Sequence, residues 1–526
     1  MSDKKNNLGR RKFLGGALGA AAGASAAAIL PSATAQAQPP GGPGGPPPGM
    51  GGPPPGPGPK LFRAELDVRD CEVTGTIPSD LSGAFYRSGP DAQYPIAPGN
   101  IPFDGEGHVS MFRIKNGRAD YRSRFAQSER YVAQDKAGKA LFPMYRNPSM
   151  DDPSVKGLSR STGNTHVINH KDMILALKED SPPIALDLLT LETVDPVYDF
   201  DGQLPKVSDT FTAHPKVDSI TGNIVAFGYE AEGFGSDVVS AFEITPQGKM
   251  VWNAKVKVPY VGLLHDFAVT ENYIIIYVIP FGIDHEQMAK GGIHWSWDGT
   301  KKTYFGAFRR DGDGSDVRWF EGANRSCTHV MGAFEDGGRI YFDGEMSEGS
   351  PFPFMPNKDG SSWDPVIGQS HITRFSVDVS SKSVKGYEME VMYPHVGALP
   401  RQDDRYNTQS YRYGFMGCPD PFADNPRAAG SCYARFDNAT RTSTLYNAGP
   451  GVSLAELCFA PKSKDSGEGV GYIIGVATQR DQSRSDLIIL DAEHLEDGPV
   501  ATIHLPVRAA GQIHGWWVRE DQMPQA

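Results

Sequence analysis

Short apolar or alternating runs of about five to nine residues recur along the chain from residue 60 onward. Examples are "GAFYRSG", "VSMFRI", "YIIIYVI", "RIYFDGEM" and "DLIILD", and turn sequences such as "DSITGN", "TPQGK" and "EDGG" separate them. Long helical periodicity is nearly absent, and the best short helix candidates are 284–292 ("DHEQMAKGG") and 453–457 ("SLAEL"). This pattern predicts an all-β fold, either a propeller or another closed β-architecture.

One apolar run ends in an unusual way. In "DMILALKEDSPPIALD" (172–187), both faces of a predicted strand are apolar until Lys178 and Glu179. The simplest interpretation is that the strand has reached water at these two residues. The alternative is that one or both charges serve a site.

The first 37 residues have the composition of an export signal. A basic start that includes Arg10 and Arg11 precedes a mildly apolar Ala- and Gly-rich segment, which predicts a twin-arginine signal peptide over 1–37 and a periplasmic protein. An arginine pair by chance before an ordinary signal peptide is the alternative. Residues 38–59 contain mostly Pro and Gly and predict a disordered spacer, which leaves 60–526 as one β-propeller domain.

Composition excludes some partners and supports a large core. The 526 residues carry a net charge of −12 with no basic run, so nucleic acid is not an expected partner. Hydrophobic residues make up 39%, which is enough for an extensive core. The odd number and wide scatter of the cysteines predict mostly buried thiols and at most one disulfide, whose partners the sequence does not identify: Cys71, Cys327, Cys418, Cys432 and Cys458.

Four of the 13 histidines occupy similar local settings, at the start or end of an apolar run. They occur in "TAHPKVD" (His214), "LLHDFAV" (His265), "CTHVMGAFE" (His329) and "QIHGWWV" (His514). Their separations of 51, 64 and 185 residues match no local chelate spacing, so structural histidines are the simpler interpretation of each one alone. Two others in "THVINHKD", His166 and His170, are interpreted as turn and edge residues.

Several motifs in order give the chain a specific resemblance. "LSGAFYRSGP", "FDGEGHVSMFRI", "TAHPKVDSITGN", "LLHDFAVTENY", "HVMGAFEDGGRIYFD" and "IHGWWV" resemble motifs of the carotenoid cleavage oxygenase family over about residues 61–518. The resemblance implies a seven-bladed β-propeller whose loops and short helices cap one face over a non-haem Fe(2+) site. It also implies the metal ligands, one from each of four blades: His214, His265, His329 and His514.

The resemblance further implies carboxylates that hold the far ring nitrogens of the metal ligands. By motif position these are Glu179 in "ALKE" and Glu456 in "AELCFAP". A third family position is a Glu in a Glu-x-Pro stretch, but the stretch here is "GALPRQD", with Ala398 in place of Glu. One of His265, His329 and His514 would then rely on water or a backbone carbonyl in place of this carboxylate. Glu388 or Glu390 could substitute for it, but neither is the favoured candidate.

Within the family, the chain is most similar to lignostilbene dioxygenases and isoeugenol monooxygenases. That subgroup carries a Lys before the supporting Glu, a Tyr upstream and a Phe in "FDG", which correspond here to Lys178, Tyr145 and Phe103. The resemblance implies that Lys178 and Tyr145 act on the phenolic oxygen of a 4-hydroxylated stilbene or phenylpropene, while Phe103 packs on its ring. The expected reaction is O2-dependent cleavage of the alkene to aldehydes. Pairing of Lys178 with Asp180 would weaken this interpretation.

Two other functions remain as hypotheses. One is apocarotenoid cleavage, which would give Lys178 no role. The other is an exported propeller that binds a ligand without catalysis. The absence of the expected Glu at position 398 is the observation that supports this hypothesis. In either case a monomer or homodimer, with possible peripheral membrane contact, is expected.

Overall fold

The computed structural model describes most of the chain after residue 63. The described ranges are 64–383, 385–393, 395–421, 430–479 and 484–524. The predicted signal peptide (1–37) and spacer (38–59) lie outside these residues, so their boundaries stay predictions. No helix in the described ranges has the length and apolar character needed to cross a lipid bilayer.

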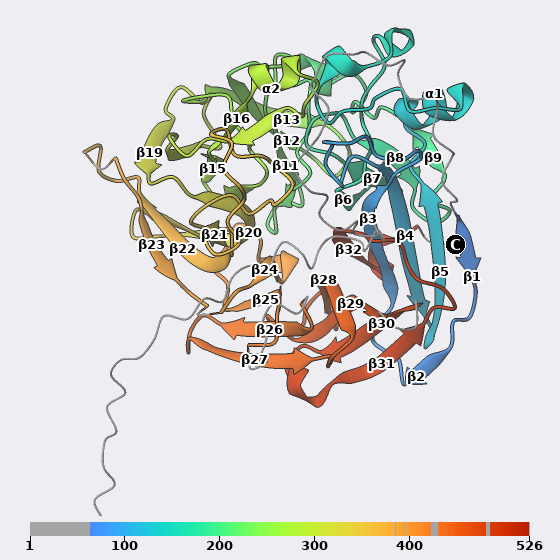
Figure 1. Ribbon diagram of the computed structural model, residues 1–526. Coiled ribbons are helices and arrows are strands. Elements are labelled where there is room, and N and C mark those ends of the chain that lie inside the picture. Colours follow the sequence, from blue (N-terminus) through green and yellow to red (C-terminus); the bar gives the residue numbers. More distant parts are fainter. Residues whose placement is uncertain (1–63, 384, 394, 422–429, 480–483, 525–526) are drawn as a thin grey trace, which may run out of the picture.

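Seven antiparallel sheets of four or five strands form a ring of blades (Figure 1), which confirms the predicted seven-bladed β-propeller. The first four blades, each given in hydrogen-bonded order, are β1 (Leu66–Val68), β5 (Arg118–Phe125), β4 (Glu106–Lys115), β3 (Gly83–Asp91) and β32 (His514–Arg519); β6 (His166–His170), β7 (Met173–Leu177), β8 (Ile184–Asp187) and β9 (Thr193–Asp195); β10 (Lys216–Val217), β11 (Ile224–Gly228), β12 (Val238–Ile244) and β13 (Met250–Lys257); and β14 (Phe267–Val269), β15 (Tyr273–Val278), β18 (Thr303–Arg309) and β19 (Arg318–Gly322).

The remaining blades follow in chain order. They are β20 (Ser326–Asp336), β21 (Arg339–Ser347), β22 (His371–Asp378) and β23 (Glu388–Val391); β24 (Ala398–Gln402), β25 (Tyr413–Cys418), β26 (Cys432–Asp437) and β27 (Thr442–Asn447); and β28 (Val452–Pro461), β29 (Gly471–Gln479), β30 (Arg484–Asp491), β31 (Pro499–His504) and β2 (Val73–Gly75). The inner strands β14, β20, β24, β28, β32 and β6 contact one another in succession around the axis.

Pairing between the two ends of the described chain closes the ring. The C-terminal strand β32 pairs with β3, with Ser88 opposite His514, and β2 pairs with β31 of the last blade. Both faces of each blade pack against neighbours, so central strands such as β15 are buried almost throughout. The apolar runs of the sequence therefore match strands buried on both faces.

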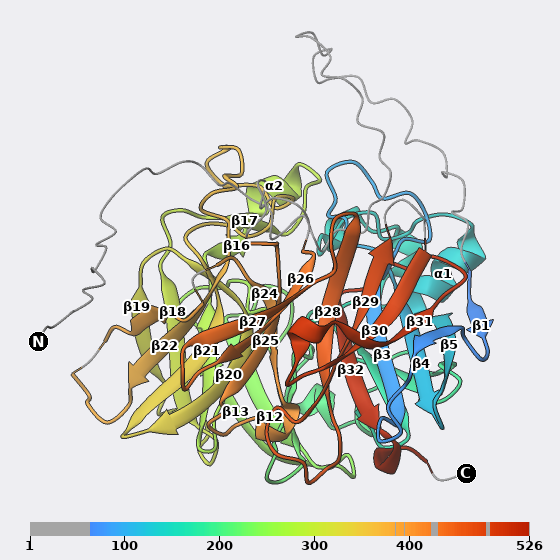
Figure 2. The same ribbon diagram turned by 90° about the horizontal axis from the view of Figure 1, so that it is seen from below.

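Helices are few in the described ranges, and both α-helices lie on one side of the ring. Two α-helices are described, α1 (Glu129–Ala137) and α2 (His285–Ala289). Figure 2 shows both on the same face, α2 beside the hairpin of β16 (Phe281–Ile283) and β17 (Trp295–Trp297). The short 3-10 helices are η1 (Pro148–Met150), η2 (Pro153–Val155), η3 (Leu204–Lys206), η4 (Asp404–Tyr406), η5 (Leu495–Asp497) and η6 (Glu520–Gln522).

The two helix predictions from sequence had different outcomes. The candidate at 284–292 is confirmed, because it contains α2. The candidate at 453–457 is wrong, because "SLAEL" lies inside β28, where pairing with β29 outweighs local helix propensity. Helix α1 was missed, although a cap residue before it and Gly138 after it mark both of its ends.

The cap of α1 provides a first test of this local structure. The side chain of Ser128 accepts a hydrogen bond from the backbone N–H of Tyr131 at 3.0 Å. Ser128→Ala is expected to lower the free energy of unfolding by about 1 kcal/mol, measured by urea denaturation. The control Ser154→Ala, in an exposed turn, should change it less; equal effects would contradict the capping role.

Candidate metal centre

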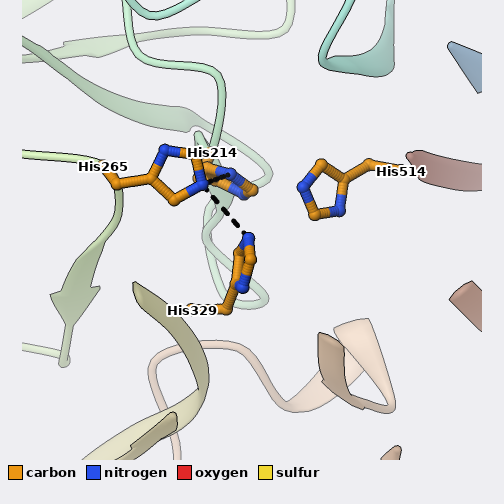
Figure 3. A group of neighbouring side chains, drawn as sticks. All are labelled: His214, His265, His329 and His514. Carbon is orange, nitrogen blue, oxygen red and sulfur yellow. Dashed lines mark hydrogen bonds between the residues drawn. The ribbon is translucent and has the colours of Figure 1, made fainter. Parts of the chain in front are cut away.

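Four imidazoles from four blades meet on the propeller axis (Figure 3). They belong to His214, two residues before β10; His265, two residues before β14; His329, within β20; and His514, the first residue of β32. One ring nitrogen of each lies within 4.8 Å of those of the others. Each of these four blades offers one residue at or near the start of its inner strand to the centre, which explains why residues so distant in sequence come together.

The free nitrogens of the cluster point at one another. The Nε2 atom of His265 lies 3.2 Å from that of His214 and 3.1 Å from that of His329. Burial lowers the pKa of His214 well below its usual value, and burial lowers that of His514 to about 4. For His329, the carboxylate of Glu345 outweighs burial and raises the pKa. Imidazoles whose Nε2 atoms converge are a donor set that suits a divalent transition metal such as iron(II).

The two carboxylates expected from the resemblance lie against two of these histidines. Glu179 Oε2 is 2.7 Å from Nδ1 of His265, and Glu456 Oε1 is 2.8 Å from Nδ1 of His514. The other oxygen of Glu456 accepts the backbone N–H of Gly515 at 2.8 Å. A carboxylate on Nδ1 fixes the tautomer that leaves Nε2 free to bind a metal.

The third supporting carboxylate comes from a residue that sequence reasoning missed, Glu345 on β21. Its Oε2 lies 2.7 Å from Nδ1 of His329 and also accepts the hydroxyl of Thr328. Consecutive strand residues normally point to opposite faces, but irregular pairing between β20 and β21 lets both contact one carboxylate. The backbone N–H of Leu399 donates to Glu345 as well.

The substitutes named from sequence do not take this place. Glu388 and Glu390 lie on the outer strand β23 and form exposed ion pairs with Arg339 and Arg441. That hypothesis is therefore wrong, because an outer strand lies far from the axis. The available signal was the Glu in "FDGEM", on the strand paired with the one that carries His329.

His166 begins β6, the edge strand of its blade, as its interpretation as an edge residue expects, but it is buried beside the cluster and does not face water. Its ring centroid lies 5.7 Å from that of His214 and 5.4 Å from that of His514. Nδ1 is 2.9 Å from the carbonyl oxygen of Ala213, and Arg401 lies 3.3 Å from Nε2. These contacts occupy both nitrogens of His166 and leave it as a packing neighbour of the quartet.

His170 was also interpreted as a turn or edge residue, and it too is buried. It ends β6, and its ring packs against the rings of Tyr198 and Phe200. Apolar neighbours, and not water, surround this histidine.

Arg401 links several of these groups. Its side chain is 14% exposed, and its guanidinium donates to both oxygens of Glu456 at 3.2 Å and to the carbonyl oxygen of Gly515. Burial raises the pKa of Glu456, but Arg401 and His514 together outweigh burial and hold this pKa far below the usual value. The carboxylate that supports His514 is therefore kept ionised.

A polar cavity of about 50 Å³ opens against the cluster, which is room for a few water-sized molecules. Besides His214, His329 and His514, charged side chains line it: Lys216, Asp266, Arg401, Asp404 and Glu456. Lys216 pairs with Asp266 at 2.6 Å.

Lys178 and Glu179 are buried. The simplest interpretation of the sequence, that the strand reaches water at these residues, is therefore wrong. Strand β7 ends at Leu177, and both charged residues are 7% exposed in the turn that follows. Because a turn does not alternate faces, both side chains can enter the interior. Glu179 then reaches His265, and Lys178 lies beside Tyr145.

Tyr145 and Lys178 lie together next to the supporting carboxylate of His265. The hydroxyl of Tyr145 donates to Oε1 of Glu179 at 3.2 Å, and Nζ of Lys178 lies 5.0 Å from the centroid of the Tyr145 ring. Burial raises the pKa of Tyr145 well above its usual value, so its hydroxyl stays protonated as a donor. Phe103, half-buried, makes an edge contact with Phe354 at 5.0 Å.

Asp180 does not neutralise the lysine. It pairs with buried Arg146 at 3.5 Å, and Arg146 also pairs with Glu230. With the described residues, Lys178 makes no hydrogen bond or ion pair. Two buried carboxylates, Asp104 and Glu179, lie close enough for the charge of Lys178 to help lower their pKa values. This attraction offsets part of the cost of burying the ammonium group, whose hydrogen-bond donors can still serve a polar ligand.

The fold and this cluster define a β-propeller with a four-histidine centre. Residues 61–519 match the protein family described as retinal pigment epithelial membrane protein, and the chain belongs to this carotenoid oxygenase family. The chain is 39% identical over 477 residues to lignostilbene-alpha,beta-dioxygenase isozyme III of Sphingomonas paucimobilis, with 88% of this chain and 96% of that protein covered.

Two further comparisons agree. Isoeugenol monooxygenase of Pseudomonas putida is 36% identical, with 86% of this chain and 95% of that protein covered. The crystal structure of lignostilbene dioxygenase from Pseudomonas brassicacearum matches with a TM-score of 0.83 and 35% identity, covering 87% of this chain and 96% of that one. The chain is a dioxygenase-type enzyme of this family.

Proposed function

We propose that the protein is a non-haem iron(II) dioxygenase that cleaves the alkene of a 4-hydroxylated stilbene or phenylpropene with O2 to give aldehydes. The observation that carries this proposal is the buried lysine at position 178, beside Tyr145 and within the contact chain that leads through Glu179 to His265. A carotenoid hydrocarbon has no polar group that a cation at this position could bind. A phenolic substrate has one, its oxygen.

The metal part of the proposal rests on the donor set. His214, His265, His329 and His514 would hold iron(II), and the bound iron would supply the activation of O2. Glu179, Glu345 and Glu456 keep three of the rings oriented through Nδ1.

The phenol part of the proposal rests on Lys178 and Tyr145. An ammonium group near the phenolic oxygen stabilises its ionised form and lowers its pKa. The Tyr145 hydroxyl has one proton, which it gives to Glu179 in this structure and can turn toward the same phenolic oxygen when substrate binds. Electron density from that oxygen then reaches the alkene through the ring and makes it more reactive. Phe103 and its neighbour Phe354 offer an apolar wall for the aromatic ring.

A substrate panel tests the proposed function. Purified enzyme supplied with iron(II) is assayed on a 4-hydroxystilbene, its 4-methoxy counterpart, isoeugenol and an apocarotenal. Rapid aldehyde formation from the hydroxylated stilbene or isoeugenol, with little from the methoxy compound, is expected. Turnover of the apocarotenal alone would refute the phenol part, and absence of turnover and of bound iron would favour a ligand-binding propeller.

Export is a separate proposal, supported by the composition of residues 1–37. Periplasmic protein should begin at or close to Gln38, as determined by N-terminal sequencing of the fractionated protein. Full-length protein confined to the cytoplasm would show that the segment is not an export signal.

A further inference from the structure

Two of the five cysteines face each other across a pair of strands far from any role in the proposed reaction. Cys418 ends β25, Cys432 begins β26, and the two are directly opposite in the antiparallel register. Directly opposite residues project to the same face of a sheet. Both belong to one buried apolar cluster, together with Met416 and Ala434, the next such pair along the strands.

The two thiols interact with each other. The neighbouring thiol of Cys432, together with burial, raises the pKa of Cys418 well above its usual value, whereas the Cys418 thiol lowers the pKa of Cys432. Tyr393 lies 4.0 Å from Sγ of Cys418, and Ser431 lies 3.9 Å from Sγ of Cys432. The two thiols therefore titrate as a pair, which loses its first proton more readily than its second.

The other three cysteines lack this arrangement. Cys71 and Cys458 share a different apolar cluster, and Cys327 lies in a third. Burial raises the pKa of Cys71 to about 11, that of Cys458 to about 12 and that of Cys327 well above its usual value. What separates them from Cys418 and Cys432 is the missing partner: Cys327 lies opposite Met346 and Cys458 opposite Ile474, and Cys71 is in no strand.

We propose that Cys418 and Cys432 form a dithiol that closes to a disulfide by exchange with an external disulfide. Directly opposite residues in an antiparallel pair have Cα atoms about 4.5–5.5 Å apart, which lies within the range of about 4.4–6.8 Å found in disulfides. The proposal does not depend on the proposed function, because neither residue contacts the histidine cluster or Lys178.

The exchange balances without any further reagent. Cys432 is 1% exposed, so the exchange proceeds when the adjoining ends of β25 and β26 open locally. The Cys432 thiolate then attacks one sulfur of the external disulfide, whose other sulfur leaves as a thiolate. The Cys418 thiol loses its proton and displaces the first external sulfur, which forms the Cys418–Cys432 bond. Two cysteine thiols are oxidised and one external disulfide is reduced to two thiols.

The bond would tie β25 to β26 at the ends of the connection 419–431. A disulfide that closes such a loop restricts the unfolded chain and so favours the folded one. The oxidised protein should therefore unfold at a higher urea concentration than the reduced protein, and a thiol reductant should abolish the difference.

Peptide mapping tests the proposal on the folded, full-length holoprotein. The protein is equilibrated in a series of glutathione redox buffers, quenched with an alkylating reagent, denatured and digested with trypsin. The two cysteines fall in separate tryptic peptides, 413–427 and 428–435. We expect these peptides joined, and two of five thiols lost, in oxidising buffer, with complete return in reducing buffer.

Matched cysteine variants test whether the disulfide joins Cys418 and Cys432. Cys418→Ser and Cys432→Ser should each prevent the joined peptide and the shift in the urea midpoint, whereas Cys458→Ser should preserve both. Five free thiols in every buffer, or joining only after the protein is unfolded, would overturn the proposal. Because the wild-type map alone gives this answer, the test does not depend on the folding of any variant.

Discussion

Lys178→Met is expected to lower kcat/KM for a 4-hydroxystilbene by about 10²–10³-fold, because a fixed charge that stabilises charge developing in the transition state contributes on this scale. Methionine keeps most of the length and apolar volume of the lysine stem but removes the ammonium group. Iron content should be unchanged, since Lys178 is not in contact with an imidazole of the quartet. Steady-state kinetics with metal analysis on the same preparations measures both quantities.

Two controls separate charge from packing at this position. Lys301→Met removes a lysine whose Nζ lies 4.2 Å from the centroid of the Tyr260 ring, a similar contact outside the histidine cluster, and should leave kcat/KM near the wild-type value. Slow turnover of the 4-methoxy substrate should fall much less than turnover of the phenol. An equal loss on both substrates would mean that Lys178 only supports the fold.

Glu345→Ala is expected to weaken iron(II) binding by about 10–100-fold, the usual effect of removing a carboxylate that orients a metal-binding histidine. The variant takes the acceptor from Nδ1 of His329 and from the N–H of Leu399, whose left-handed backbone (φ of 52°) lies beside it. Anaerobic titration against a competing chelator measures the affinity.

The surface residue Glu388 provides the matched control for this prediction. It was the candidate that sequence reasoning offered for the same role, and Glu388→Ala should leave iron affinity unchanged. Glu345→Gln should retain more affinity than Glu345→Ala, because the amide oxygen can still accept one hydrogen bond. Wild-type affinity in Glu345→Ala would show that His329 needs no carboxylate.

Most of the fold could be predicted from the apolar pattern, since strands buried on both faces leave continuous apolar runs. The run "YIIIYVI" became β15, and "RIYFDGEM" became the core of β21. "SLAEL" misled because pairing between neighbouring strands decides the structure of a short segment. The number of blades, seven, was predicted from the family resemblance, because the apolar pattern alone does not define it.

Some residues of the candidate site could likewise be predicted from the sequence, and others could not. Motif order led to the four histidines, Glu179 and Glu456, and the structure places these groups together. Glu345 could not be found by motif position, because its role depends on irregular pairing between β20 and β21. The burial of Lys178 likewise depends on where β7 ends, one residue before it, which no alternation pattern defines.

The most direct test of the account is to locate the metal. Crystals of protein purified with iron(II) are measured on both sides of the iron absorption edge, and iron is quantified per chain in the same preparation. The account predicts about one iron per chain and one anomalous peak among the imidazoles of His214, His265, His329 and His514. Iron-supplied protein without a peak at that point, or with its peak elsewhere, would contradict it.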